Sequence, residues 1–213
     1  MDTTKKFLFV NSSDFILIRL IAFAGQAITI AFSQYFFNFS PQVTWLSWGV
    51  ALLLLLSVGL AYHLLNKGDK ILTEKQIFLF LCFDILQISI LISFNGGYTN
   101  PFIFIILAPI AIAASYLTLE RILVILSLAL VCFALIFNFF IELPEVVRPN
   151  ISIQYSLGIM ISLFISSIFL VFYLYYFSLN YKSTQKAYEL ASKQLQDEKE
   201  LLKVGGLAAA AVH

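Results

Sequence analysis

Six long apolar stretches are the feature of this sequence that most constrains its fold. They lie at about residues 15–37, 44–65, 76–94, 102–118, 121–141 and 151–178. A helix needs about 20 mostly apolar residues to cross a hydrocarbon core of roughly 30 Å, and helices are favoured there because they satisfy their own backbone hydrogen bonds. Only 12% of the residues are charged, whereas a typical soluble domain has roughly a quarter. The sequence therefore predicts an all-α fold, a polytopic six-helix transmembrane bundle whose fourth helix is the shortest.

The positions of Lys and Arg predict the orientation of these helices, because positive residues concentrate in cytoplasmic loops. With the N-terminus in the cytoplasm, the outer loops contain only Arg148. The inner segments then contain Lys5, Lys6, Lys67, Lys70, Lys75 and Arg121. An even number of spans places both termini in the cytoplasm. The net charge of +1 gives no reason to expect a nucleic-acid partner.

The segment after residue 178 is polar and has a heptad periodicity. Large side chains recur every seven residues, at Tyr181, Tyr188, Leu195 and Leu202. This pattern predicts a parallel two-stranded coiled coil that continues from the sixth span and joins two copies in a homodimer. A solvated helical tail is the simpler alternative. We divide the chain into a six-span membrane domain (1–178), a cytoplasmic coiled-coil linker helix (179–204) and the start of a further helix (205–213).

The two cysteines of the chain, Cys82 and Cys132, both lie inside predicted spans. Two thiols in apolar surroundings give no basis for a disulfide framework or for a metal site. We expect both to be structural residues.

The segment NGGYTNPF, residues 95–102, connects the third and fourth spans. Gly96 or Gly97 can adopt the left-handed conformation that ends the third helix. Asn100 is a suitable N-cap, and Pro101 suits the first position of the next helix. A simple turn is therefore one interpretation of this segment.

Aromatic residues near this turn favour a second interpretation, a binding site. Phe94, Tyr98 and Phe102 lie close to Asn100 in the sequence. Aromatic faces stack on a flat ring, and the Asn amide carries both donors and an acceptor, so it can bond to a carbonyl or to a hydroxyl group. The segment thus has the parts that a polar ring ligand requires.

Four polar residues lie inside predicted spans, namely Arg19, Gln26, Asp84 and Gln87. Ionisable groups in a membrane face the bundle interior and pair with one another. We expect Asp84 to pair with Arg19 in a structural polar cluster that includes both glutamines; proton coupling is the alternative role for Asp84. Pro109 is expected to kink the fourth span.

Several motifs together resemble a known family. The ending GGLAAAAVH is similar to the start of the phospho-acceptor box of sensor histidine kinases. IRLIAFAGQ (18–26), DILQ (84–87), GGYTNPF (96–102) and IAASYL (112–117) resemble the redox-sensing histidine kinases of the RegB/PrrB/ActS family. The resemblance extends over most of residues 15–213 and includes the order of the spans.

This resemblance implies a bacterial inner-membrane sensor that responds to a quinone, either ubiquinone or menaquinone. It implies quinone binding at residues 94–102, with Phe94, Gly96, Gly97, Tyr98, Asn100, Pro101 and Phe102 as the site. It identifies His213 as the phospho-acceptor, with ATP acting in a kinase domain beyond this chain and a response regulator as partner. We therefore expect the chain to stop part-way through a helix and to be inactive alone. The family's redox-active cysteine lies in the kinase portion, so neither Cys82 nor Cys132 takes that role.

Two rival functions remain open at this point. A small secondary transporter could use Asp84, Gln87 and the Gly-Gly break to form a path, but transporters commonly show internal repeats, and none is evident here. A histidine kinase could also sense bilayer thickness through helix mismatch rather than a quinone.

Overall fold

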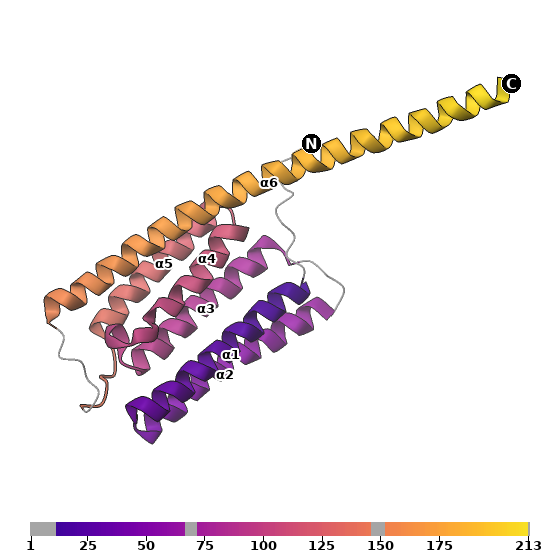
Figure 1. Ribbon diagram of the computed structural model, residues 1–213. Coiled ribbons are helices and arrows are strands. Elements are labelled where there is room, and N and C mark those ends of the chain that lie inside the picture. Colours follow the sequence, from indigo (N-terminus) through magenta and orange to yellow (C-terminus); the bar gives the residue numbers. More distant parts are fainter. Residues whose placement is uncertain (1–11, 67–71, 146–151, 213) are drawn as a thin grey trace. The chain divides into compact units, whose positions relative to one another are not determined.

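The computed structural model describes residues 12–66, 72–145 and 152–212, and these ranges are helical with short connections and no strand (Figure 1). The α-helices are α1 Ser12–Phe37, α2 Pro41–Asn66, α3 Glu74–Phe94, α4 Leu107–Tyr116, α5 Leu119–Asn138 and α6 Ile153–Val212. Two 3-10 helices, η1 Gly97–Thr99 and η2 Pro101–Ile106, connect α3 to α4. The all-α prediction is confirmed for the described part of the chain.

Five of the helices are long and apolar enough to cross a membrane: α1, α2, α3, α5 and α6. Their outward side chains are large and apolar, with Leu56 69% exposed and Phe169 68% exposed. Such a surface suits lipid rather than water. The chain is therefore a multi-pass membrane protein.

The fourth predicted span differs from the other five. It is a shorter apolar helix, Pro101–Tyr116, of which the first six residues are 3-10 and the last ten are α-helical. At about 2.0 Å per 3-10 residue and about 1.5 Å per α residue, it reaches about 27 Å. The 3-10 portion lengthens a segment that would be about 24 Å as an α-helix.

A kink is predicted at Pro109, and the structure has a change in helix type just before this residue instead. Pro109 is the third residue of α4 and is buried. Proline has no N–H to donate and its ring crowds the carbonyl four residues earlier. The backbone before it is 3-10, and the Leu107 N–H bonds to the carbonyls of Phe104 and Ile105. The structure therefore has a helix-type transition in place of a kink within a continuous α-helix.

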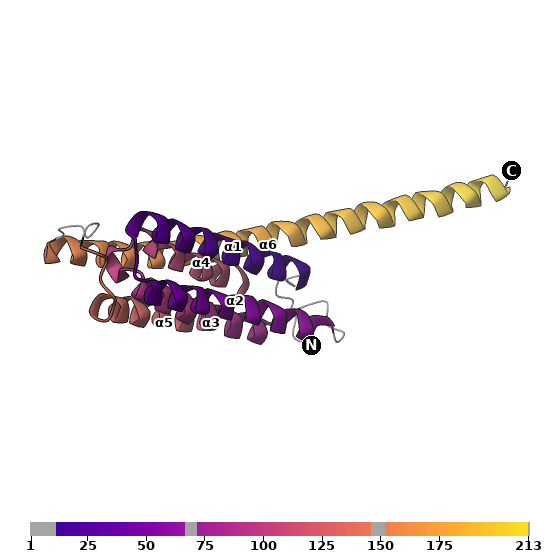
Figure 2. The same ribbon diagram turned by 90° about the horizontal axis from the view of Figure 1, so that it is seen from below.

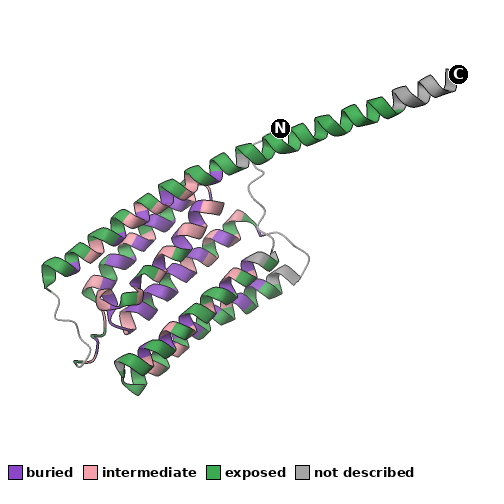
Figure 3. Ribbon diagram, in the orientation of Figure 1, coloured by how far each residue is buried: buried purple, intermediate pink, exposed green. Residues whose placement is uncertain are grey.

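The described chain divides into two compact units between Leu174 and Tyr175. In the first unit, α1 packs on α2, α2 on α3, and α3 on both α4 and α5. Figures 1 and 2 both show α1 and α2 side by side. The most buried apolar side chains lie on α3, α4 and α5 (Figure 3), and Ile85, Ile110 and Ile125 are completely buried. These three helices form the core.

The second unit contains the remainder of α6. Its side chains are exposed from Leu179 to Lys203 wherever they are described. Tyr188 is 78% exposed and Leu202 is 75% exposed in this single chain. The coiled coil, the homodimer and the domain boundaries at residues 178 and 204 stay predictions.

Candidate functional site

The glycine turn after α3 is tightly packed. Gly96 and Gly97 have φ angles of 103° and 58°, so both adopt the positive φ that was predicted for one of them. A Cβ at Gly96 would lie 2.8 Å from Leu143 Cγ, and a Cβ at Gly97 would lie 2.5 Å from Phe140 Cβ. The Ile141 N–H donates to the Ser93 carbonyl at 2.8 Å. Glycine is thus required at both positions because residues 140–143 lie directly against the turn.

Asn100 holds the second half of this turn, and its predicted role as an N-cap is confirmed. Its Oδ1 accepts from the Phe102 N–H at 2.8 Å, and its Nδ2 donates to the Asn95 carbonyl at 2.6 Å. Pro101 follows at the start of η2. Asn100 is only 5% exposed, so its amide is engaged mainly with the protein.

The aromatic residues of this segment point to different neighbours. The Tyr98 ring lies 5.1 Å from the Phe137 ring and 5.0 Å from the Phe140 ring, measured between centroids. The Phe102 ring meets Phe32 of α1 edge-on at 5.7 Å. Phe94 packs against a cluster formed by Ile30, Val50, Ala51 and Leu91. The three rings therefore do not gather around Asn100 as the sequence interpretation assumed, because the two 3-10 turns direct Tyr98 and Phe102 toward different helices.

A small cavity lies beside Asn100, between α1, α3 and η2. Its volume is about 30 Å³, and polar side chains of Gln26, Ser33, Asn95 and Asn100 line part of it. A space of this size accommodates a water molecule, whereas pockets for ligands usually measure about 300–1,000 Å³. In this conformation the cavity is too small for a ring ligand.

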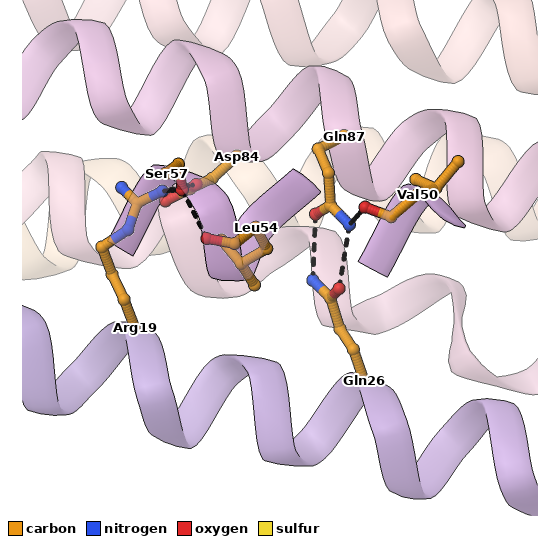
Figure 4. A network of polar contacts seen from close by, with 7 residues as sticks. All are labelled: Arg19, Gln26, Val50, Leu54, Ser57, Asp84 and Gln87. Atoms are coloured by element: carbon orange, nitrogen blue, oxygen red, sulfur yellow. Dashed lines mark hydrogen bonds and ion pairs between the residues drawn. The ribbon is translucent and has the colours of Figure 1, made fainter. Parts of the chain in front are cut away.

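The predicted intramembrane polar residues meet in an interface that joins α1 and α2 to α3 (Figure 4). Arg19 Nη2 lies 2.7 Å from Asp84 Oδ1 in a buried ion pair. The same Nη2 donates to the Ser57 hydroxyl of α2. Arg19 is 2% exposed, and its guanidinium also lies over the Phe15 and Phe80 rings. A buried charge is costly in lipid unless it is paired, and Asp84 provides that pairing.

The two glutamines form a second contact about two turns of α1 away. Gln26 Nε2 donates to Gln87 Oε1 at 3.1 Å, and Gln87 Nε2 donates to Gln26 Oε1 at 2.9 Å. Gln87 Nε2 also donates to the Val50 carbonyl of α2 at 3.0 Å (Figure 4). The amide pair therefore connects three helices.

Asn95 makes a third contact at the end of α3. Its Nδ2 donates to the Ser47 hydroxyl of α2 at 2.8 Å. We call the complete set the polar interface; its members are Arg19, Gln26, Ser47, Ser57, Asp84, Gln87 and Asn95. Because Asn100 donates to the Asn95 carbonyl, the glycine turn is connected to the polar interface.

Sequence reasoning missed Ser47, Ser57 and Asn95. Asn95 falls eight residues after Gln87, a spacing close to two turns of helix that could have indicated a shared helix face. The two serines gave no such signal, since serine is common in membrane helices.

At the opposite end of α3, Glu74 was also missed. Its Oε1 accepts from the Thr118 N–H at 2.8 Å, and its Oε2 lies 3.1 Å from Arg121 Nη1. Thr73 and Gln76 form a capping box at the start of α3. Arg121, which the sequence analysis assigned to an inner segment, is thus paired with a residue of α3.

Other predicted residues add little to the site. Cys82 is half-buried and Cys132 is buried, and both are free thiols. His213, the predicted phospho-acceptor, lies outside the described residues.

The structure has apolar helices that are joined by a buried polar interface, and α6 is 60 residues long. These features define a multi-pass membrane protein with an extended last helix. Comparison with known proteins makes this class more specific. The chain is similar to the sensor histidine kinase RegB of Cereibacter sphaeroides, with 27% identity over 202 residues, which cover 93% of this chain and 43% of RegB. No family model matches the chain, and no solved structure matches it.

The match confirms the resemblance to RegB-type sensor histidine kinases that the motifs indicated. This chain spans less than half the length of that relative. The match supports assignment of the chain as a two-component kinase sensor region.

Proposed function

We propose that this chain is the membrane sensor and linker region of a two-component histidine kinase, and that it responds to the redox state of a membrane quinone. The observation that carries the proposal is the similarity to RegB along 93% of the chain. The multi-pass helical bundle and the 60-residue α6 are compatible with such a sensor.

The ligand part of the proposal concerns residues 94–102. Quinone carbonyls only accept hydrogen bonds, whereas the hydroxyls of the reduced form also donate them. A sensor must bind the two forms with different affinity in its two conformations, because equal binding shifts no equilibrium. The glycine turn is suited to report such a difference, since it contacts residues 140–143 and is hydrogen-bonded to the polar interface.

The output part of the proposal uses α6. A change in the packing of its first turns would be passed along the helix to a dimeric coiled coil and then to His213. In the complete kinase, ATP would phosphorylate this histidine and a response regulator would accept the phosphoryl group. Both chain termini would lie in the cytoplasm of a bacterium, as the distribution of Lys and Arg predicts.

Quinone binding to the chain in lipid nanodiscs tests the proposal. A benzoquinone with a decyl tail and its reduced form would each be titrated into the chain. Binding would be followed as the displacement of a labelled analogue. We expect saturable binding whose affinity differs between the two forms. Asn100→Ala removes two hydrogen bonds from the turn and should weaken binding about tenfold.

The control is Ile28→Ala, which changes an apolar residue that is 69% exposed and should leave binding unchanged. Absence of saturable binding, or equal affinity for both redox forms, would exclude quinone as the signal. A response to bilayer thickness with no response to quinone would favour the mismatch sensor instead.

A further inference from the structure

Ser33 of α1 differs from other buried serines of the membrane helices. It is only 3% exposed, yet its hydroxyl makes no hydrogen bond to any described residue. Four other buried serines each donate to the carbonyl four residues earlier in the chain, namely Ser47, Ser89, Ser156 and Ser167. A hydroxyl that is buried without a partner is costly. Ser33 therefore requires a partner that the described chain does not supply.

The position of Ser33 places it at the small cavity beside Asn100. Ser33 follows Arg19 and Gln26 at intervals of seven residues, about two turns of helix each, so the three residues share the face of α1 that packs inside the bundle. Ser33 lines the cavity of about 30 Å³ between α1, α3 and η2. Its hydroxyl is thus adjacent to a space in which a partner can bind.

Asn95 provides a second available group in the same cavity. Its Nδ2 donates to the Ser47 hydroxyl at 2.8 Å and to the Leu91 carbonyl at 2.7 Å, and the second bond fixes the amide orientation because a carbonyl can only accept. Asn95 Oδ1 accepts no hydrogen bond from the described residues. Thr29 also lines the cavity; its hydroxyl donates to the Gln26 carbonyl at 2.8 Å, and its oxygen can still accept.

A water molecule matches this arrangement in size and in chemistry. A cavity of this volume holds one water, which needs two to four polar partners. A sodium ion would also fit the oxygen atoms of the lining. The described residues that line the cavity include no Asp or Glu, however, and an uncompensated charge is costly inside a membrane. The neutral lining therefore favours water over a cation.

We propose that this cavity binds one structural water molecule, which accepts a hydrogen bond from the Ser33 hydroxyl and donates to Asn95 Oδ1 and Thr29 Oγ1. This inference goes beyond the proposed function and does not depend on it. The water supplies a polar link between α1 and the end of α3, where the Asn95 amide bonds directly to Ser47 of α2. Because Asn100 donates to the Asn95 carbonyl, the same water connects α1 to the glycine turn.

Hydroxyl-radical footprinting of the complete, unmodified chain in nanodiscs tests the site directly. An X-ray pulse converts bound water into radicals that oxidise the side chains beside it. Ile92 and Ile85 are both buried residues of α3, at 4% and 0% exposure, but only Ile92 lines the cavity. We expect oxidation of Ile92 and none of Ile85. Failure to oxidise Ile92 above the level of Ile85 would overturn the proposal.

A substitution at Ser33 gives a second test, whose sign distinguishes a bonded hydroxyl from an unpaired one. Ser33→Ala removes the donor to the water and should raise the equilibrium constant for unfolding about tenfold relative to Ser167→Ala. Ser167→Ala is the matched control, because it makes the same change in helix propensity and removes only a bond within α6. If Ser33→Ala were as stable as the control or more stable, the hydroxyl would have no partner to lose and the proposal would be wrong.

The choice between water and a cation is tested by the salt. Unfolding of the unmodified chain should be the same in sodium chloride and in choline chloride of equal concentration. Stabilisation by sodium that disappears in Ser33→Ala would overturn the assignment to water and identify a cation site instead.

Discussion

The two flanks of the α3–α5 core are attached by different kinds of contact. On the α3 side, α1 and α2 are attached through buried polar groups, including the Arg19–Asp84 ion pair and the Gln26–Gln87 amide pair. On the α5 side, two buried serines of α6, Ser156 and Ser167, each donate to the carbonyl four residues earlier in the chain. Ser156 donates to the Ser152 carbonyl at 3.2 Å and Ser167 to the Leu163 carbonyl at 2.7 Å. A 330 Å³ apolar pocket separates parts of α5 and α6.

This difference has a physical consequence in lipid. Apolar side chains gain little by leaving a hydrocarbon solvent, so close packing and cross-helix hydrogen bonds supply most of the attraction between membrane helices. The polar interface therefore fixes the register of α1 and α2 against α3. The Ser156 and Ser167 hydroxyls of α6 make no such directional bond to a neighbouring helix, so under the proposed function α6 is the helix that we expect to move.

The largest effect should come from breaking the buried ion pair. Asp84→Leu leaves the Arg19 guanidinium, which is 2% exposed, without its charged partner. We expect a loss of about 4 kcal/mol in the free energy of unfolding, in the range for removal of one member of a buried pair. Unfolding by sodium dodecyl sulfate, followed by circular dichroism, measures this value.

The double variant Arg19→Leu/Asp84→Leu is the control, because it removes both charges together. Its loss should be clearly smaller than that of Asp84→Leu alone. Additive losses in the double-mutant cycle would mean that the two groups do not interact.

A smaller effect should follow from Gly97→Ala, which disturbs the turn between the two flanks. The new Cβ would lie 2.5 Å from Phe140 Cβ at a φ of 58°. Overpacking and the left-handed backbone together should cost about 3 kcal/mol. Gly158→Ala is the matched control, because a Cβ there meets nothing within 4 Å. Equal stability of the two alanine variants would show that residues 140–143 do not restrict the turn.

The comparison of the flanks is sharpened most by a pair of polar substitutions. Gln87→Leu removes hydrogen bonds to Gln26 and to the Val50 carbonyl, and should cost about 1.5 kcal/mol. Ser167→Ala removes only a bond within α6 and should change stability by less than about 0.5 kcal/mol. The same denaturation assay measures both. A larger loss for Ser167→Ala would reverse the assignment of the fixed and movable flanks.

The number and positions of most helices could be predicted because lipid allows so few backbone structures. The fourth span shows the limit of that argument. Its 3-10 portion depends on Pro101 and Pro109, and a hydropathy pattern contains no information about helix type. Gly96, Gly97 and Asn100 were read correctly because their turn and capping geometry is local.

The contacts between helices could be predicted where polar side chains inside a membrane required partners. Arg19 and Asp84 had few alternative partners, and the two glutamines were expected in the same cluster. The directions of Tyr98 and Phe102 depend instead on how η1 and η2 are wound, so proximity in the sequence was misleading. The α5–α6 pocket was invisible at that level, because Phe133, Phe164 and Asn138 become neighbours only when the two helices pack.

The 3-10 portion of the fourth span has a rotational consequence. A 3-10 helix turns about 120° per residue and an α-helix about 100°. Conversion of the six residues of η2 to α-helix would therefore shorten the span by about 3 Å and unwind it by about 120°. Pro101 and α4 would therefore rotate relative to each other about the helix axis. A change in membrane thickness could in this way become a twist at the glycine turn.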